Sequence, residues 1–135
     1  MSSISRDSMM QPILAASPNF EPVWREFIEE WHDQPEGLPM YLVLSDLARH
    51  IATLFRCGAD SELREIFQII EHWHLHGDAY VREAATVGLL EALQNTNVVG
   101  TETPTRCFGY LGPESLRRWQ KVQNFWEKGE LIRDD

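Results

Sequence analysis

Three histidines alternate in the stretch HWHLHGD, residues 72–78, and histidine nitrogens are common zinc ligands. Alternating side chains share one face only on a strand; on a helix, His72 and His76 share a face and His74 points away from them. The preceding apolar residues recur with helical spacing: Ile66, Phe67, Ile70 and Trp73. We therefore predict that His74 faces the core, that His72 and His76 face outward, and that the three bind no metal.

The other reactive side chains match no catalytic motif. Catalysis by paired carboxylates needs two groups that face each other across a pocket, whereas the acids of residues 26–33 are expected along one helix face. Cys107 would need an adjacent base to act as a nucleophile. No glycine-rich phosphate loop is present. We expect a non-enzymatic protein without a cofactor; the alternative is a small enzyme that uses Cys107 or His74.

The composition is that of one folded domain. The chain has 135 residues, of which 43% are hydrophobic, enough to build a core without a metal or disulfide. Cys57 and Cys107 match neither a zinc spacing nor a redox pair. The first residues do not resemble a secretory signal, and no window is apolar enough to span a membrane. We predict a cytoplasmic protein with no membrane partner.

The charge is strongly and unevenly negative. The net charge is −9. Residues 21–91 contain 14 acidic and 5 basic side chains, whereas residues 114–135 contain 5 of each. An acidic body repels nucleic-acid phosphates, which excludes nucleic acid as a partner. It would attract a basic protein partner, although the same charge could simply keep the protein soluble.

Hydrophobic periodicity predicts an all-α fold, a single-domain bundle of about five helices. The expected helices cover residues 20–33, 39–57, 61–75, 79–95 and a segment that begins at residue 113. Proline at the start and glycine after the end delimit the second of these, which we place at the centre of the bundle. We expect no strand.

The segments between and beyond these helices give the domain organisation. Residues 1–17 are predicted as a flexible N-terminal arm, residues 18–130 as the helical domain and residues 131–135 as a frayed C-terminus. Residues 95–112 are expected to form a long irregular loop. Gly77 is expected to end its helix in the left-handed conformation. The small residues after it are expected to pack on the helix of residues 61–75.

The stretch ELREIFQIIEHW followed by GDAYVREAATVGLLEAL resembles one HEAT-type or armadillo-type repeat. The resemblance rests on the capping Asp78, on Val81 and Arg82, and on the alanines at 84 and 85. It implies an antiparallel helical hairpin over about residues 61–94.

A longer pattern adds the stretch FGYLGPESLRRW and spans roughly residues 38–126. It resembles a family of small bacterial helical proteins of unknown activity. Some of these are encoded beside polymorphic toxins and are candidate immunity proteins. The resemblance implies a compact acidic protein, a monomer or weak dimer, that binds a basic toxin domain and blocks it. The alternative is a scaffold or adaptor subunit that binds a protein through its helical hairpin.

The candidate partner-binding residues lie on three segments. The acidic face of the first helix contributes Glu26, Glu29, Glu30 and Asp33; the exposed edge of the third contributes Glu62, Glu65 and His72; the long loop contributes Arg106 and Tyr110. Each of these residues could equally be part of an ordinary solvated surface. A dimer contact through Trp119 and Trp126 is a further alternative.

Overall fold

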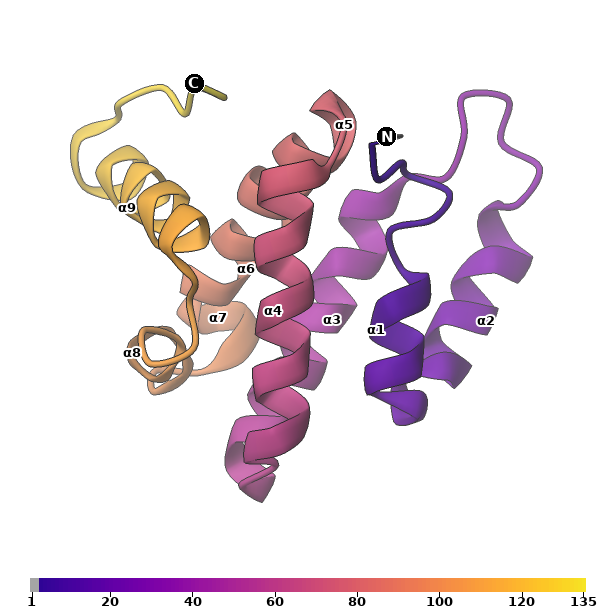
Figure 1. Ribbon diagram of the computed structural model, residues 1–135, viewed down its shortest axis with the longest axis horizontal. Coiled ribbons are helices and arrows are strands. Elements are labelled where there is room, and N and C mark those ends of the chain that lie inside the picture. Colours follow the sequence, from indigo (N-terminus) through magenta and orange to yellow (C-terminus); the bar gives the residue numbers. More distant parts are fainter. Residues whose placement is uncertain (1–2) are drawn as a thin grey trace.

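The computed structural model describes residues 3–135, and these form an all-α domain (Figure 1). The first half contains α1 (Gln11–Ala16), the 3-10 turn η1 (Pro18–Phe20), α2 (Glu21–Trp31), α3 (Met40–Cys57) and α4 (Asp60–His76). The second half contains α5 (Ala79–Glu83), the π-helical segment η2 (Ala84–Leu90), α6 (Glu91–Gln94), α7 (Thr96–Val99), α8 (Thr103–Cys107) and α9 (Pro113–Lys128). The all-α fold is confirmed. The five predicted helices are also confirmed, because α5, η2 and α6 follow one another without a break and form one rod, which corresponds to the single helix predicted there.

The core is built around α3, as the apolar character of that helix predicts. Along its length the buried side chains are Met40, Val43, Leu44, Leu47, Ala48, Ile51, Ala52, Leu54 and Phe55. Helix α3 contacts α2, α4 and the α5–α6 rod, so it lies at the centre of the bundle behind α4 (Figure 1). No helix within residues 3–135 combines the length and apolar character needed to cross a membrane.

The predicted hairpin is present between α4 and the α5–α6 rod (Figure 1). The Asp78 carboxylate accepts a hydrogen bond of 2.9 Å from the Val81 backbone N–H, which is the expected cap. The prediction for Gly77 is wrong, because its φ of −72° and ψ of 152° are extended. Glycine is needed there for space instead: a Cβ would lie 2.4 Å from the Trp73 carbonyl oxygen.

The small residues of η2 pack on a different helix from the one predicted. The rod makes its main contact with α3 and only a lesser one with α4. A Cβ on Gly88 would lie 3.2 Å from the Tyr41 ring and 3.3 Å from Leu44, both on α3. The close approach that small residues permit is therefore used inside the domain, against α3.

The flexible N-terminal arm predicted for residues 1–17 is corrected by the structure for its described part. Met9, Met10 and Ile13 are buried, and the Trp73 indole N–H donates a hydrogen bond of 3.0 Å to the Met9 carbonyl. Ile4 pairs with the α4–α5 turn: it donates to the His76 carbonyl and accepts from Asp78 N–H, both at 2.9 Å. Three buried apolar side chains hold this N-terminal segment against the domain. Three are too few to give a periodic pattern in the sequence, so the docking was not predicted.

The frayed C-terminus predicted for residues 131–135 and the long loop are corrected as well. Residues 131–135 have no regular secondary structure, but Asp134 forms ion pairs with Arg82 and Arg118, which hold the segment in place. Residues 95–112 contain the short helices α7 and α8. Thr103 and Cys107 are buried there, so part of this segment belongs to the core.

Candidate functional site

Helix α2 forms the edge of the bundle and exposes an acidic face. Its Phe27 is buried against the core, while Glu26, Glu29 and Glu30 point to the outside. An open groove of about 710 Å³ lies between α2 and α3. We call it the acidic groove; it is lined by Val23, Glu26, Phe27, Glu29, Glu30, Trp31, Leu42 and Asp46.

Three of the four predicted α2 residues therefore share one surface. Asp33 is exposed in the turn after α2 and does not line the groove. The groove gains two residues from α3 that the sequence did not suggest, Leu42 and Asp46. Their spacing of four is the only sequence signal that could have found them, because it places both on the outer face of a helix whose other face is buried.

The carboxylates of the groove are largely unpaired within the part of the chain that the structure describes. Among residues 3–135, Glu26, Glu29 and Glu30 make no ion pair, and Asp46 pairs only with the exposed Arg49 at 3.2 Å. Leu42 is 50% exposed beside them. The groove thus combines uncompensated negative charge with an accessible apolar side chain, a combination suited to a partner that carries basic and apolar groups.

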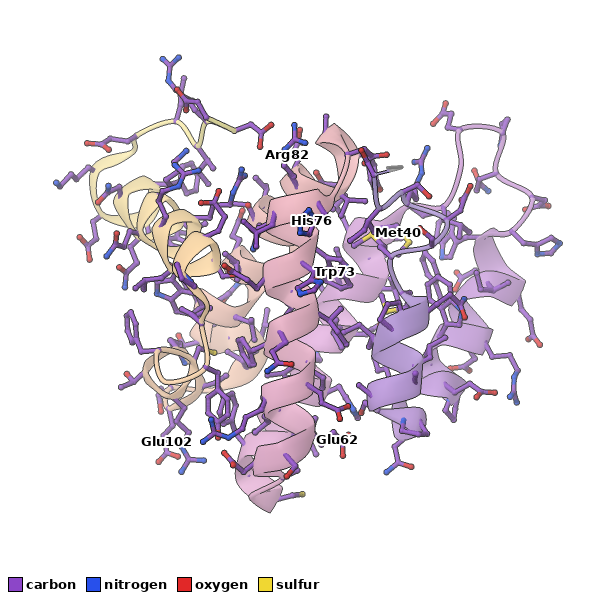
Figure 2. The ribbon with its side chains drawn as sticks, in the orientation of Figure 1. Met40, Glu62, Trp73, His76, Arg82 and Glu102 are labelled. Atoms are coloured by element: carbon purple, nitrogen blue, oxygen red, sulfur yellow. The ribbon has the colours of Figure 1, made fainter. Side chains whose placement is uncertain are left out.

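The predicted residues of α4 have different roles. Glu62 is partly buried and accepts a hydrogen bond from the Ser17 hydroxyl, whose oxygen lies 2.7 Å from His50 Nε2. Glu65 and His72 are exposed on a shallow surface that they share with Pro12 of α1. In Figure 2, Glu62 lies at the far end of α4 from His76. Glu65 and His72 therefore lie on a second surface, separate from the acidic groove.

Ser17, His50 and Glu62 contain the residue types of a hydrolytic triad, but their arrangement is different. In a triad the histidine lies between the nucleophile and the carboxylate, whereas here the Ser17 hydroxyl lies between His50 and Glu62. Ser17 is fully buried. Burial lowers the pKa of His50, and nearby Glu62 opposes that shift. The cluster joins the end of α1 to α3 and α4.

The predicted loop residues anchor the loop. Arg106 donates a hydrogen bond of 3.0 Å to the Phe55 carbonyl, and its guanidinium lies 3.7 Å from Glu102. The Tyr110 hydroxyl donates to Asp60, and its ring packs edge-on against Phe55 with centroids 5.3 Å apart. These contacts tether Arg106 to α3 and Tyr110 to α3 and α4, and neither residue lines the acidic groove, so the loop is a third and separate surface.

The two groups considered for catalysis are both buried. Cys107 is fully buried, and burial raises the pKa of its thiol to about 12, so the thiol stays protonated near neutral pH. His74 is 2% exposed; its Nδ1 lies 2.8 Å from the Ser115 hydroxyl, and its Nε2 has no hydrogen-bond partner among the described residues. Burial chiefly lowers the pKa of His74 to about 4. Both groups are therefore uncharged at neutral pH.

The histidines are placed as the helical spacing predicts. His74 is in the core, whereas His72 and His76 are exposed with ring centroids 5.7 Å apart (Figure 2 labels His76). In the described part of the chain, no three His, Cys, Asp or Glu side chains are arranged to hold a metal ion.

One cluster of charged residues was not predicted from the sequence. Arg118 of α9 is buried, yet it carries ion pairs to Glu114 at 3.0 Å and to Asp134 at 2.9 Å. Arg82 of α5 binds the same Asp134 at 2.8 Å. We call these residues the arginine cluster. Its partners are far apart in the sequence, so no local pattern reveals it.

The family model named "Domain of unknown function (DUF7674)" matches residues 10–127. The chain belongs to the DUF7674 family. The match begins just before α1 and ends within α9, so the docked α1 is part of the DUF7674 domain and residues 128–135 lie outside it. No curated protein and no solved structure matches the chain.

Proposed function

We propose that this DUF7674 protein is a non-enzymatic binding protein whose acidic groove receives a basic surface of a partner protein. The observation that carries the proposal is the groove itself: Glu26, Glu29 and Glu30 line it together with the exposed Leu42 and have no ion pair among the described residues. The most specific form of the proposal is a cytoplasmic immunity protein that occludes a toxin. The resemblance to candidate immunity proteins supports that form.

Electrostatics give the groove two roles in such a complex. A cleft lined by one sign of charge speeds association with an oppositely charged partner, and the effect weakens as salt rises. Once a partner lysine or arginine is in place, the half-buried Trp31 and the exposed Leu42 provide apolar contact at the centre. A basic toxin domain would have its charged surface covered, and no bond would need to be broken.

The placement of the reactive groups supports binding over catalysis. A nucleophile must be ionisable and reachable by a substrate, whereas the Cys107 thiol is buried and its pKa is raised to about 12. Neither Cys107 nor His74 lines the acidic groove. Cys57 and Cys107 are both free thiols, which fits a reducing compartment such as the cytoplasm.

The same groove could serve an adaptor. An adaptor that binds through the helical hairpin is disfavoured, because the small residues of the rod are covered by α3. The alternative of a dimer through Trp119 and Trp126 has less surface than expected. Trp119 is buried in the core, and only Trp126, which is 50% exposed, remains available. We propose that the protein acts as a monomer or a weak dimer. Protection of cells against a toxin would distinguish an immunity protein from an adaptor.

The test is capture of partners from the native host with the full chain as bait, together with two charge-reversed variants. Glu26→Lys/Glu29→Lys/Glu30→Lys reverses the groove. Asp7→Lys/Glu127→Lys/Glu130→Lys changes the net charge equally at exposed positions elsewhere. We expect one basic toxin-like protein that the groove variant loses and the control variant retains. Equal capture by both variants would exclude the groove as the binding site.

A second experiment tests neutralisation itself. Cells that produce the captured protein should grow when the unaltered chain is co-produced and fail to grow with the groove variant. A captured protein that is harmless to cells, or a housekeeping subunit, would replace the immunity function with the adaptor function while leaving the groove as the binding site.

A further inference from the structure

The arginine cluster holds the chain's own C-terminal segment in a way that resembles a bound peptide. Arg82 projects from α5 toward that segment (Figure 2). Its Nε lies 3.1–3.2 Å from the two Asp134 carboxylate oxygens, and its Nη2 lies 2.8 Å from one of them. Arg118 Nη1 donates to the same carboxylate at 2.9 Å. Two guanidinium groups thus converge on one carboxylate, and charge-assisted hydrogen bonds of this kind are roughly twice as strong as neutral ones.

The backbone of the segment is bound as well. Arg118 Nη2 donates to the Asp134 carbonyl at 3.2 Å, and Arg117 Nη1 donates to the Asp135 carbonyl at 2.7 Å. Lys121 Nζ donates to the Arg133 carbonyl at 2.8 Å. Cationic side chains of α9 therefore contact three successive carbonyls. Contacts of this kind recognise a peptide main chain in addition to an acidic side chain.

The C-terminal segment also makes an apolar contact with the domain. Ile132, two residues before Asp134, is partly buried and packs against the core. Beside it, a pocket of about 240 Å³ is lined by Glu83, Thr86, Val87, Arg118, Ile132, Arg133 and Asp134. Thr86 and Val87 come from the π-helical segment η2, and π-helical turns are frequent at functional sites. The bound pattern is an apolar residue, any residue, and then two acids.

The buried guanidinium of Arg118 needs an anion as its partner. Arg118 is 4% exposed, and a buried guanidinium is strongly disfavoured without a full set of acceptors. Glu114, four residues earlier on α9, supplies one acceptor at 3.0 Å, and Thr86 lies at the limit of hydrogen-bonding distance, 3.5 Å. The remaining acceptor is Asp134. Arg82, Thr86 and Arg118 lie within the DUF7674 match of residues 10–127, whereas Asp134 lies outside it.

We propose that α5, η2 and α9 form a receptor for an acidic, extended peptide segment of a partner protein, and that residues 132–135 occupy it in the free chain. The partner segment carries an apolar residue two positions before a pair of acids and displaces the chain's own segment. The positive groups that face it are Arg82, Arg117, Arg118 and Lys121, and the negative ones are Glu83 and Glu114. This site does not depend on the acidic groove.

The test is binding of a fluorescent peptide with the sequence of residues 129–135, GELIRDD, to the full chain and to its Asp134→Asn/Asp135→Asn variant. The tethered segment competes at an effective concentration on the order of millimolar. We expect the variant to bind the peptide at least tenfold more tightly than the unaltered chain. The same peptide with asparagine in place of both aspartates should lose that binding.

Two arginine substitutions in the variant background locate the binding. Arg82→Gln should weaken it several-fold, because the Arg82 side chain supplies the two-nitrogen contact to the carboxylate. Arg25→Gln is the matched control, since Arg25 is an exposed arginine with an ion pair on α2. Absence of binding by the folded variant, equal binding of the asparagine peptide, or no effect of Arg82→Gln would each overturn the proposal.

An experiment on the unaltered chain covers the case in which the variant does not fold. Unlabelled peptide is added in excess to the isotope-labelled full chain, and the amide resonances of Asp134 and Asp135 are followed. Displacement should move them toward their positions in the free peptide. Resonances that stay fixed at millimolar peptide would show that the segment is not displaceable and would overturn the proposal.

Discussion

The acidic groove and the arginine cluster use charge in opposite ways. In the groove, Glu26, Glu29 and Glu30 are exposed and have no ion pair among the described residues. In the cluster, Arg118 is buried and each of its partners is provided by the chain itself. Exposed unpaired charges contribute little to folding and remain available to a partner, whereas buried paired charges cannot lose a partner without a large cost. The two regions should therefore respond differently to the same kind of substitution.

The largest effect is expected from Arg118→Ala. This change removes a buried guanidinium, and it takes one arginine partner each from Glu114 and Asp134. Breaking a buried pair by removing one member costs about 3–5 kcal/mol. Urea denaturation should therefore show a loss of that order in the free energy of unfolding. A loss below about 1 kcal/mol would mean that water replaces the arginine, and the contrast with the groove would disappear.

The second effect is a fall in stability between pH 6.5 and pH 4. Burial lowers the pKa of His74 from 6.5 to about 4, so in that interval the unfolded chain binds a proton that the folded chain does not. Stability is therefore present above pH 6.5 and is lost as the pH falls, by roughly 3 kcal/mol in total. Below about pH 4 the loss continues, because hydrogen bonds from arginines lower the pKa of both Glu114 and Asp134 to about 2.

Two variants test whether His74 causes the loss of stability between pH 6.5 and pH 4. His74→Leu should flatten the dependence between pH 6.5 and pH 4, whereas His72→Gln, which changes an exposed histidine on the same helix, should leave it unchanged. The measurement is the free energy of unfolding from urea denaturation at four or five pH values. An equally steep curve for His74→Leu would assign the loss to the carboxylates instead.

The sequence predicted the parts of the fold that depend on local repetition. The five long helices were found because each buries a continuous apolar stripe, and the placement of the histidines followed from the same spacing. The docked N-terminus was missed because it is held by Met9, Met10, Ile13 and a hydrogen bond to Trp73, contacts that span 64 residues. A short segment with few apolar residues gives no periodic signal, whatever its final burial.

The candidate site was predictable to a similar extent. Helical spacing placed Glu26, Glu29 and Glu30 on one surface, but the groove also needs Leu42 and Asp46 from α3, and the packing of two helices is not visible in either sequence segment. The arginine cluster joins Arg82 to Asp134 across 52 residues. Its arginines look like ordinary surface charges until the fold brings the acids to them.

A smaller effect is expected from Arg82→Gln. Arg82 is partly exposed, and Asp134 keeps its contact with Arg118 after the change. A partly screened ion pair of this kind contributes about 1 kcal/mol. A double-mutant cycle with Asp134→Asn should give a coupling energy of that size in urea denaturation, and the matched pair of Arg25 and Glu21 on α2 should give less. A larger coupling for the α2 pair would reverse the proposed ranking of the two regions.

The smallest effect on stability, and the largest on binding, is expected from Glu26→Gln/Glu29→Gln/Glu30→Gln. Exposed substitutions of this kind change the free energy of unfolding by less than about 0.5 kcal/mol each. These glutamates form no ion pair within residues 3–135, so their removal also relieves repulsion between neighbouring like charges. Binding of a basic partner should nevertheless weaken at least tenfold, chiefly through slower association at low salt. A strong loss of stability without a loss of binding would mean that these glutamates serve the fold, and the acidic groove would then resemble the arginine cluster.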